Sequence, residues 1–146
     1  MDGAVLAARV VLGGLLLATG VLKLGHPVEL AAAIAGFRLL PEPLVGPLAL
    51  ALPYFEMLLG AYLVAGLFVR AAACIAAAQF SLYAAAIASA VLRHIPADCG
   101  CFGPNDKAVA DWPHVVFDLA LAAAALFIAW RAPGYLAVDR RFHQPS

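Results

Sequence analysis

The chain has 146 residues, of which 65% are hydrophobic and 12% are charged, and its formal net charge is zero. A soluble domain is usually about 45–50% apolar and about 25% charged, so this composition predicts a membrane protein. The length allows a single domain. The zero net charge gives no support to nucleic-acid binding. The sequence contains no Walker loop, GxGxxG or HExxH motif, so those cofactor and metal classes lack their usual signature.

Four apolar stretches lie at about 4–24, 45–68, 70–92 and 113–130. Each has close to the ~20 residues that a helix needs to cross about 30 Å of hydrocarbon. Because backbone groups in lipid must bond internally, these stretches are predicted to be helices rather than strands. The predicted fold is an all-α membrane protein with four transmembrane helices in one domain over 1–146, including a polar tail at 132–146.

The topology is predicted from the number of spans and from the basic residues. Four spans put both termini on one side, which carries five basic residues against four on the other side. Because cytoplasmic loops carry the excess of Lys and Arg, this balance predicts cytoplasmic termini. The loop with two cysteines then faces the extracytoplasmic side, where disulfides form and persist. The predicted location is the bacterial cytoplasmic (inner) membrane.

The loop between the first two spans is predicted to contain a helix. Residues 28–40 carry apolar side chains at spacings near three and four. Pro27 suits the first turn, and Pro41 ends the run. We expect a short amphipathic helix at the membrane surface. It either covers the bundle or acts as a lid over a redox site or a docking surface.

Two further features predict how the spans pack. Almost no turn separates the second and third spans at about 68–70, which predicts an antiparallel helical hairpin. Small residues let membrane helices approach closely, and Gly13, Gly14 and Gly20 predict a close crossing on the first helix.

Charged residues inside the spans are candidates for function, because a charge in hydrocarbon is costly. Glu56 lies in the second span and Asp118 in the fourth, while Lys23 ends the first span and Arg93 and His94 end the third. Each helix therefore offers a polar group toward the end that carries the cysteines. One interpretation is an ion pair of Glu56 with Lys23 or Arg93. The other, which is compatible with it, is a proton relay or a device that adjusts the pKa of a thiol.

Three other residues in the spans are predicted to have structural roles. Arg9 is expected to extend its guanidinium to the membrane surface on the side of the termini. Gln79 is expected to make an interhelical hydrogen bond. Cys74 is expected to be a small buried residue, too far from the other cysteines to react with them.

Cys99 and Cys101 are separated by Gly100 alone, in the longest polar interruption of the chain. An extended spacing of about 6–7 Å is near the upper limit for a disulfide, and a bend at glycine brings it within range. A small, strained and exposed disulfide is more oxidising, which suits a catalyst. The alternatives are a metal site that includes His94 or His114, with a further ligand from a partner, and inert thiols.

Together these residues resemble the MauE branch of the DoxX-like four-helix membrane proteins. The matching features, in chain order, are Gly20 with Lys23-Leu24, Phe37-Arg38-Leu39-Leu40-Pro41, Pro53 with Glu56, and Cys99-Gly100-Cys101-Phe102-Gly103. The resemblance covers nearly the whole chain. It implies a role in methylamine utilisation, in which the protein and a thioredoxin-like partner form or rearrange disulfides of a periplasmic protein.

The architecture is also similar to that of two families of quinone-linked disulfide generators, the DsbB and vitamin K epoxide reductase families. Those families use two cysteine pairs beside a quinone, whereas this chain has one pair on that side. Either a partner supplies the second pair or no quinone step occurs. Quinone is the one candidate cofactor, and Phe37, Tyr54, Phe55 and Trp112 are its candidate lining, although aromatic residues at membrane interfaces are more often anchors.

The predicted function is thiol–disulfide exchange between the Cys-Gly-Cys pair and an extracytoplasmic thioredoxin-like protein, in support of disulfide formation or maturation of exported proteins. The catalytic candidates are Cys99, Cys101 and Glu56. The supporting charged residues are Lys23, Arg38, Arg93, His94 and Asp118. The alternatives are a non-catalytic accessory subunit of a redox or quinone-linked complex and a metal-binding membrane protein; a homo-oligomer is compatible with each.

Overall fold

The structure, a computed structural model, describes residues 2–99 and 108–132 of the chain. These ranges contain α1 (Asp2–Lys23), α2 (Pro27–Gly36), α3 (Glu42–Ala65), α4 (Val69–Leu92) and α5 (Trp112–Arg131). Helices α1, α3, α4 and α5 are each long and apolar enough to cross a membrane. The predicted fold of four spanning helices with a short helix in the first loop is confirmed. The second span begins at Glu42 rather than at about 45 and ends at Ala65 rather than at about 68.

Local residues explain where several helices begin and end. Pro27 lies in the first turn of α2, as predicted, but α2 ends at Gly36 and Pro41 instead caps the start of α3. Helix α3 ends at Gly66, which has a left-handed φ of 76° and donates its N–H to the carbonyl of Tyr62 at 2.9 Å. Glycine adopts this conformation at little steric cost. The chain therefore turns back within three residues, 66–68, to enter α4.

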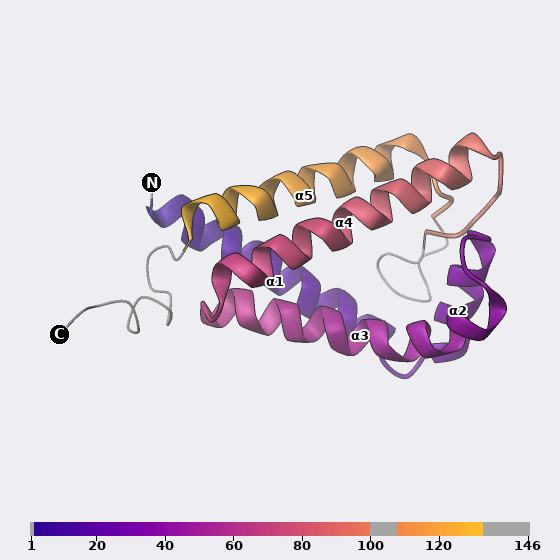
Figure 1. The fold of residues 1–146 in the computed structure, drawn as a ribbon, viewed down its shortest axis with the longest axis horizontal. Helices are drawn as coiled ribbons and strands as arrows, with labels where there is room; N and C mark the ends of the chain where they lie inside the picture. The colour runs from indigo at the N-terminus through magenta and orange to yellow at the C-terminus, as the bar shows by residue number, and fades with distance from the viewer. Residues whose placement is uncertain (1, 100–107, 133–146) are drawn as a thin grey trace.

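The spanning helices form two antiparallel pairs, α1 with α3 and α4 with α5 (Figure 1). Figure 1 shows α3 and α4 meeting at the short turn and diverging toward the end where α2 lies. The predicted antiparallel turn between α3 and α4 is present, but each of these helices packs mainly on another helix. The cysteine end is here the end of the bundle that carries α2, the last turn of α4 and Cys99; the terminus end is the opposite one.

The close packing of α1 on α3 depends on glycines. A Cβ added to Gly13 would lie 2.8 Å from the carbonyl oxygen of Gly60, and one added to Gly60 would lie 2.6 Å from that of Gly13. A Cβ on Gly20 would lie 2.6 Å from Met57 Cγ. The predicted close crossing is confirmed for Gly13 and Gly20, whereas Gly14 faces open space. Small residues on both helices therefore let the two backbones touch.

The core between the two pairs joins leucines of α1 and α3 to alanines of α4 and α5. It includes Leu12, Leu16, Leu59, Leu63, Ala72, Ala73, Ala76, Ala77, Phe80, Ala122, Ala125 and Ile128. Cys74 does not belong to it. The expectation that Cys74 is buried is wrong, because the residue is exposed on the side of α4 that faces away from the bundle.

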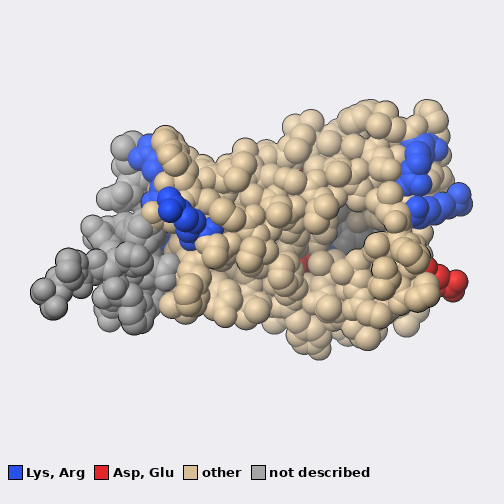
Figure 2. Space-filling view, in the orientation of Figure 1, with Lys and Arg blue, Asp and Glu red and all other residues tan. Residues whose placement is uncertain are grey.

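The outer surface of the bundle is apolar, and its charges gather at the ends. Figure 2 shows Lys and Arg at both ends of the visible face, with a mostly uncharged surface between them. Leu82 and Val11 are each 70% exposed on this surface, as side chains in contact with lipid would be. Arg9 departs from its predicted position: it is 0% exposed, and its Nε donates to the carbonyl of Leu63 at 3.1 Å. Its guanidinium is thus held between α1 and α3.

Candidate functional site

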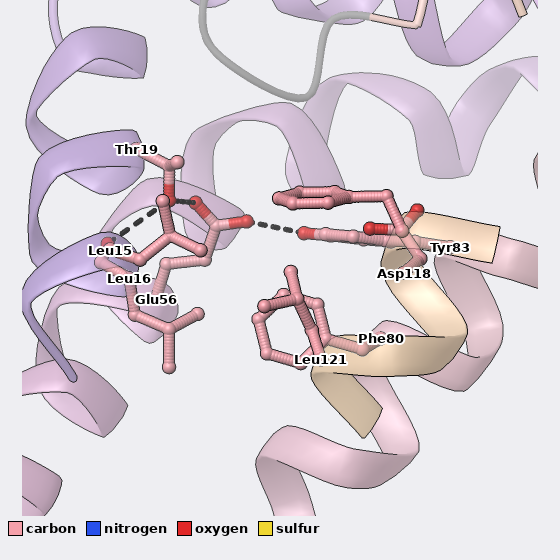
Figure 3. A pocket seen from close by; sticks show the side chains of 9 residues that line it. Leu15, Leu16, Thr19, Glu56, Phe80, Tyr83, Asp118 and Leu121 are labelled. Atoms are coloured by element: carbon pink, nitrogen blue, oxygen red, sulfur yellow. Dashed lines mark hydrogen bonds between the residues drawn. The ribbon is translucent and has the colours of Figure 1, made fainter. Parts of the chain in front are cut away.

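A carboxylate at the centre of the bundle is surrounded by hydrogen-bond donors. Glu56 of α3 is 1% exposed. Lys23 Nζ lies 2.8 Å from its Oε1 and 2.9 Å from its Oε2. Thr19 donates to Oε2 at 3.3 Å, Gln79 donates to Oε1 at 3.1 Å, and the hydroxyl of Tyr83 donates to Oε1 as well. These five residues form the Glu56 cluster, part of which is shown in Figure 3.

The Glu56 cluster joins three helices. Thr19 and Lys23 are four residues apart on α1, and Gln79 and Tyr83 are four apart on α4, so each pair shares a helix face. Lys23 also lies 5.6 Å from the centre of the Tyr83 ring, a cation–π distance. The cluster therefore connects α1 and α3 to α4 across the space where the two helix pairs diverge. The predicted interhelical hydrogen bond of Gln79 is confirmed.

A small cavity adjoins this cluster. Its volume is about 20 Å³, and its lining comes from α1, α3, α4 and α5. The polar lining residues are Thr19, Glu56, Tyr83 and Asp118, and the apolar ones are Leu15, Leu16, Phe80, Phe117 and Leu121. Asp118 is 4% exposed, and its Oδ2 has no hydrogen-bond partner in the described part of the chain. Buried polar atoms are normally paired, so this oxygen marks a place where a further donor fits.

Cys99 is buried at the cysteine end, where it is 7% exposed. It belongs to an apolar cluster that includes Ile87 of α4 and Val115 of α5, and Phe37, one residue after α2, packs against this cluster. The side chain of Arg93 also contacts Phe37, because Arg93 Nη2 donates a hydrogen bond to the backbone carbonyl of Phe37. The segment after α2 is thus tied to the end of α4 beside Cys99.

The base of the cysteine loop is held by backbone hydrogen bonds. The N–H of Cys99 donates to Ala108 at 2.8 Å, and that of Ala110 donates to Ala97 at 2.9 Å. These bonds flank an antiparallel bridge between Asp98 and Val109. Cys99 is disulfide-bonded; Cys101 lies outside the described residues, so the pairing of Cys99 with Cys101 stays a prediction.

The Glu56 cluster and Cys99 are neighbours along two helices. Tyr83 and Ile87 are four residues apart on α4, a rise of about 6 Å. Val115 and Asp118 are three residues apart on α5, so they lie within one turn of each other. Of the predicted charged residues, the structure therefore brings Lys23, Glu56 and Asp118 together, about one helical turn from members of the Cys99 cluster.

The other three predicted charged residues lie at the surface of the cysteine end. Arg93 follows Tyr83 by ten residues, about 15 Å along the helix, and its Nε donates to Ser89. Glu56 therefore pairs with Lys23, and Arg93 is no part of the Glu56 cluster. Arg38 and His94 are exposed, and each has a left-handed φ of 53°. Sequence reasoning missed Thr19 and Tyr83, whose only signal was a polar group inside an apolar span.

A capping interaction fixes the start of α5. Asp111 accepts the backbone N–H of His114 at 3.1 Å, and its carboxylate also contacts the His114 ring. The hydrogen bond from the His114 side chain, followed by the one from its backbone, holds the pKa of Asp111 below its usual value. An ionised carboxylate at a helix N-terminus also interacts favourably with the helix dipole.

The described residues offer little for the predicted cofactor and for a metal. Over 2–99 and 108–132, no group of three or more His, Cys, Asp and Glu side chains could hold a metal ion. The candidate quinone-lining residues do not line the cavity: Tyr54 is 65% exposed, Trp112 is 51% exposed and Phe37 packs near Cys99. A cavity of about 20 Å³ has room for about one water molecule. This cavity is therefore too small for a quinone ring.

Comparison with known proteins assigns the chain to a family. The family model for methylamine utilisation protein MauE matches residues 1–131. The chain is 38% identical to the methylamine utilization protein MauE of Paracoccus denitrificans over 128 residues, which cover 87% of this chain and 69% of that protein. It is also 38% identical to the MauE proteins of Methylophilus methylotrophus and Methylorubrum extorquens, over 78% and 82% of this chain and 61% and 64% of theirs.

The chain thus spans about two thirds of the length of these relatives. No solved structure matches it. The match to the family model covers all four spanning helices and the cysteine loop between α4 and α5. On this match, and on four helices that can each cross a bilayer, the chain belongs to the MauE family of multi-pass membrane proteins.

Proposed function

We propose that this chain is a membrane thiol–disulfide exchange protein whose Cys99–Cys101 pair transfers electrons to or from an extracytoplasmic thioredoxin-like protein. The position of Cys99 carries the proposal. It lies at the base of a loop held by backbone hydrogen bonds. Its apolar cluster includes Ile87 of α4, one helical turn from Tyr83, which bonds to the buried Glu56. Cys101 is the second sulfur of the proposed exchange.

The sulfur bonds, electrons and protons of the exchange balance between this chain and its partner. A thiolate of the partner attacks one sulfur of the Cys99–Cys101 disulfide, which breaks the S–S bond and forms a mixed disulfide. The partner's second thiol then displaces the bound cysteine. The partner loses two electrons and two thiol protons, and Cys99 and Cys101 end as thiols. The reverse sequence oxidises the pair with the same groups.

Glu56 serves in this proposal as a positioning residue. Lys23, Thr19, Gln79 and Tyr83 all donate to its carboxylate, so its oxygens already hold α1, α3 and α4 together. Helix α4 carries Ile87, against which the Cys99 cluster packs. The ion pair thus holds α4, on which the Cys99 cluster packs, in place.

The pathway and the topology belong to the same proposal. The names of the relatives connect them to methylamine utilisation, and we infer that this chain supports the maturation of an exported protein in such a pathway. The cysteine end would face the extracytoplasmic side of the bacterial inner membrane, and both termini would face the cytoplasm.

Trapping of mixed disulfides tests the proposal. One of the two single variants, Cys99→Ser or Cys101→Ser, should accumulate a covalent complex with a thioredoxin-like protein, because it keeps the attacking cysteine and lacks the resolving one. The double variant should form none and should lose the maturation of the exported protein. Cys74→Ser is the matched control, because this free cysteine is exposed elsewhere on α4. Full maturation in the double variant would instead indicate an accessory subunit.

A further inference from the structure

The cavity beside the Glu56 cluster is lined by residues of all four spanning helices. Four of its lining side chains are polar, and the rest are apolar or aromatic. Figure 3 shows the hydroxyl of Tyr83 pointing at Glu56, with Thr19 bonded to the same carboxylate from the opposite side. A volume of about 20 Å³ exceeds the roughly 10–15 Å³ that one water needs, and the polar lining supplies the hydrogen-bond partners that such a water requires.

The two carboxyl groups of this cavity differ in their surroundings. The negative charge of the Glu56 carboxylate is compensated by the ammonium group of Lys23 at 2.8 Å and by three further hydrogen-bond donors. Asp118 is also buried, yet its Oδ2 has no partner among the described residues. A buried charge without a paired cation or donors is strongly unfavourable. The cost disappears when the carboxyl group is neutral and bonded to water.

We propose that Asp118 and one water molecule in this cavity form a proton-binding site, in which Asp118 carries the proton and the water links it to the Glu56 cluster. The water would complete a hydrogen-bonded connection between α5 and the three helices that the cluster already joins. The ligands of the site are thus a proton and a water, and the site does not depend on the thiol reaction.

The same geometry gives the site a connection to the cysteine end. His114 precedes Asp118 by four residues on α5, so the two share a helix face. His114 in turn contacts Asp111 at the surface. The titratable groups that face or act on Asp118 are Lys23 from α1, Glu56 from α3, Tyr83 from α4 and His114 from α5. In this proposal a proton would reach the site by way of His114, from the side on which Cys99 lies.

Infrared difference spectroscopy tests the protonated carboxyl group. Spectra of the 146-residue chain in lipid nanodiscs, recorded before and after a rise in pH, should contain the C=O stretch of a protonated carboxyl group. Asp118→Asn should abolish this band. Asp98→Asn, which makes the same change at an exposed position, should leave it in place. Asp118→Glu keeps a carboxyl group and should shift the band. A band that is unchanged in both Asp118 variants overturns the proposal.

A second measurement tests the water. The same spectra should contain an O–H stretch that shifts in heavy-oxygen water. Leu121→Phe, which fills the cavity, should remove this signal. Leu119→Phe makes the same change at a residue of α5 that is 52% exposed and should keep it. Survival of the water signal in Leu121→Phe overturns the assignment of the water to this cavity.

Discussion

Lys23 places one ammonium group within 2.9 Å of both carboxylate oxygens of Glu56, and the two side chains are only 3% and 1% exposed. The ion pair links α1 to α3 near the middle of the bundle, one turn of α4 away from the residues that pack on Cys99. A buried pair of this kind is costly to break, because the remaining charge has no compensation.

Removal of either charge should therefore destabilise the protein. Glu56→Gln leaves the ammonium group of Lys23 buried without a counter-charge, and the free energy of unfolding should fall by about 3–5 kcal/mol. Lys23→Met should have a similar effect on its own. The double variant should lose less than the sum, because neither charge remains. Denaturant unfolding of all four proteins in detergent measures the coupling, and strictly additive losses would contradict the pairing.

The glycine contact of α1 with α3 makes a second prediction. Gly13→Ala should destabilise the protein by about 1–3 kcal/mol, because its methyl group would lie 2.8 Å from the carbonyl oxygen of Gly60 and the helices must separate. Gly14→Ala makes the same change at the next position, where nothing lies within 4 Å. It should be neutral or slightly stabilising, since alanine favours a helix over glycine by roughly 0.5–1 kcal/mol. Thermal unfolding of the two variants checks the contrast.

The spanning helices were predictable because length and hydropathy are local properties of the sequence. The pairing of Lys23 with Glu56 was among the predicted alternatives, since a buried charge in a membrane calls for a partner. The exclusion of Arg93 from the cluster was not predictable. It depends on how far along α4 the contact with α3 occurs, and no sequence pattern gives that distance.

The error at Cys74 has a physical cause. In a membrane, the side of a helix that faces lipid is as apolar as the side that faces the core. Helix α4 therefore carries no periodic pattern that tells Cys74, which is exposed, from Ala73 and Ala76, which are buried. The rotation of each helix about its axis, which also brings Tyr83 onto Glu56, is decided by tertiary packing.

The cap of α5 should make stability depend on acid pH. The hydrogen bonds from His114 hold the pKa of Asp111 below its usual value of roughly 3.9. Their stabilising contribution is fully present above that usual value and is lost as the pH falls through the lowered pKa of the folded state. Asp111→Asn keeps a capping oxygen but cannot titrate, so its unfolding temperature should fall less steeply at acid pH. Asp98→Asn is the control for the loss of one exposed carboxyl group. If the unfolding temperature of Asp111→Asn fell with pH as steeply as that of the unmodified protein, the role of Asp111 would be contradicted.

The contact of Arg93 with the carbonyl of Phe37 should control access to the buried cysteine. Phe37 packs on the apolar cluster that contains Cys99, and the Arg93 guanidinium ties its backbone to the end of α4. In Arg93→Gln the glutamine side chain is too short to reach the carbonyl of Phe37. A hydrogen bond of this kind typically contributes about 1 kcal/mol. Loss of about 1 kcal/mol would let the segment that carries Phe37 move away from the Cys99 cluster roughly five times more often. A small phosphine reductant should then reduce the Cys99 disulfide about five times faster. Arg38→Gln removes a neighbouring positive charge that is exposed and serves as the control for electrostatic effects. Equal rates in the two variants would mean that access to Cys99 does not depend on the Arg93–Phe37 contact.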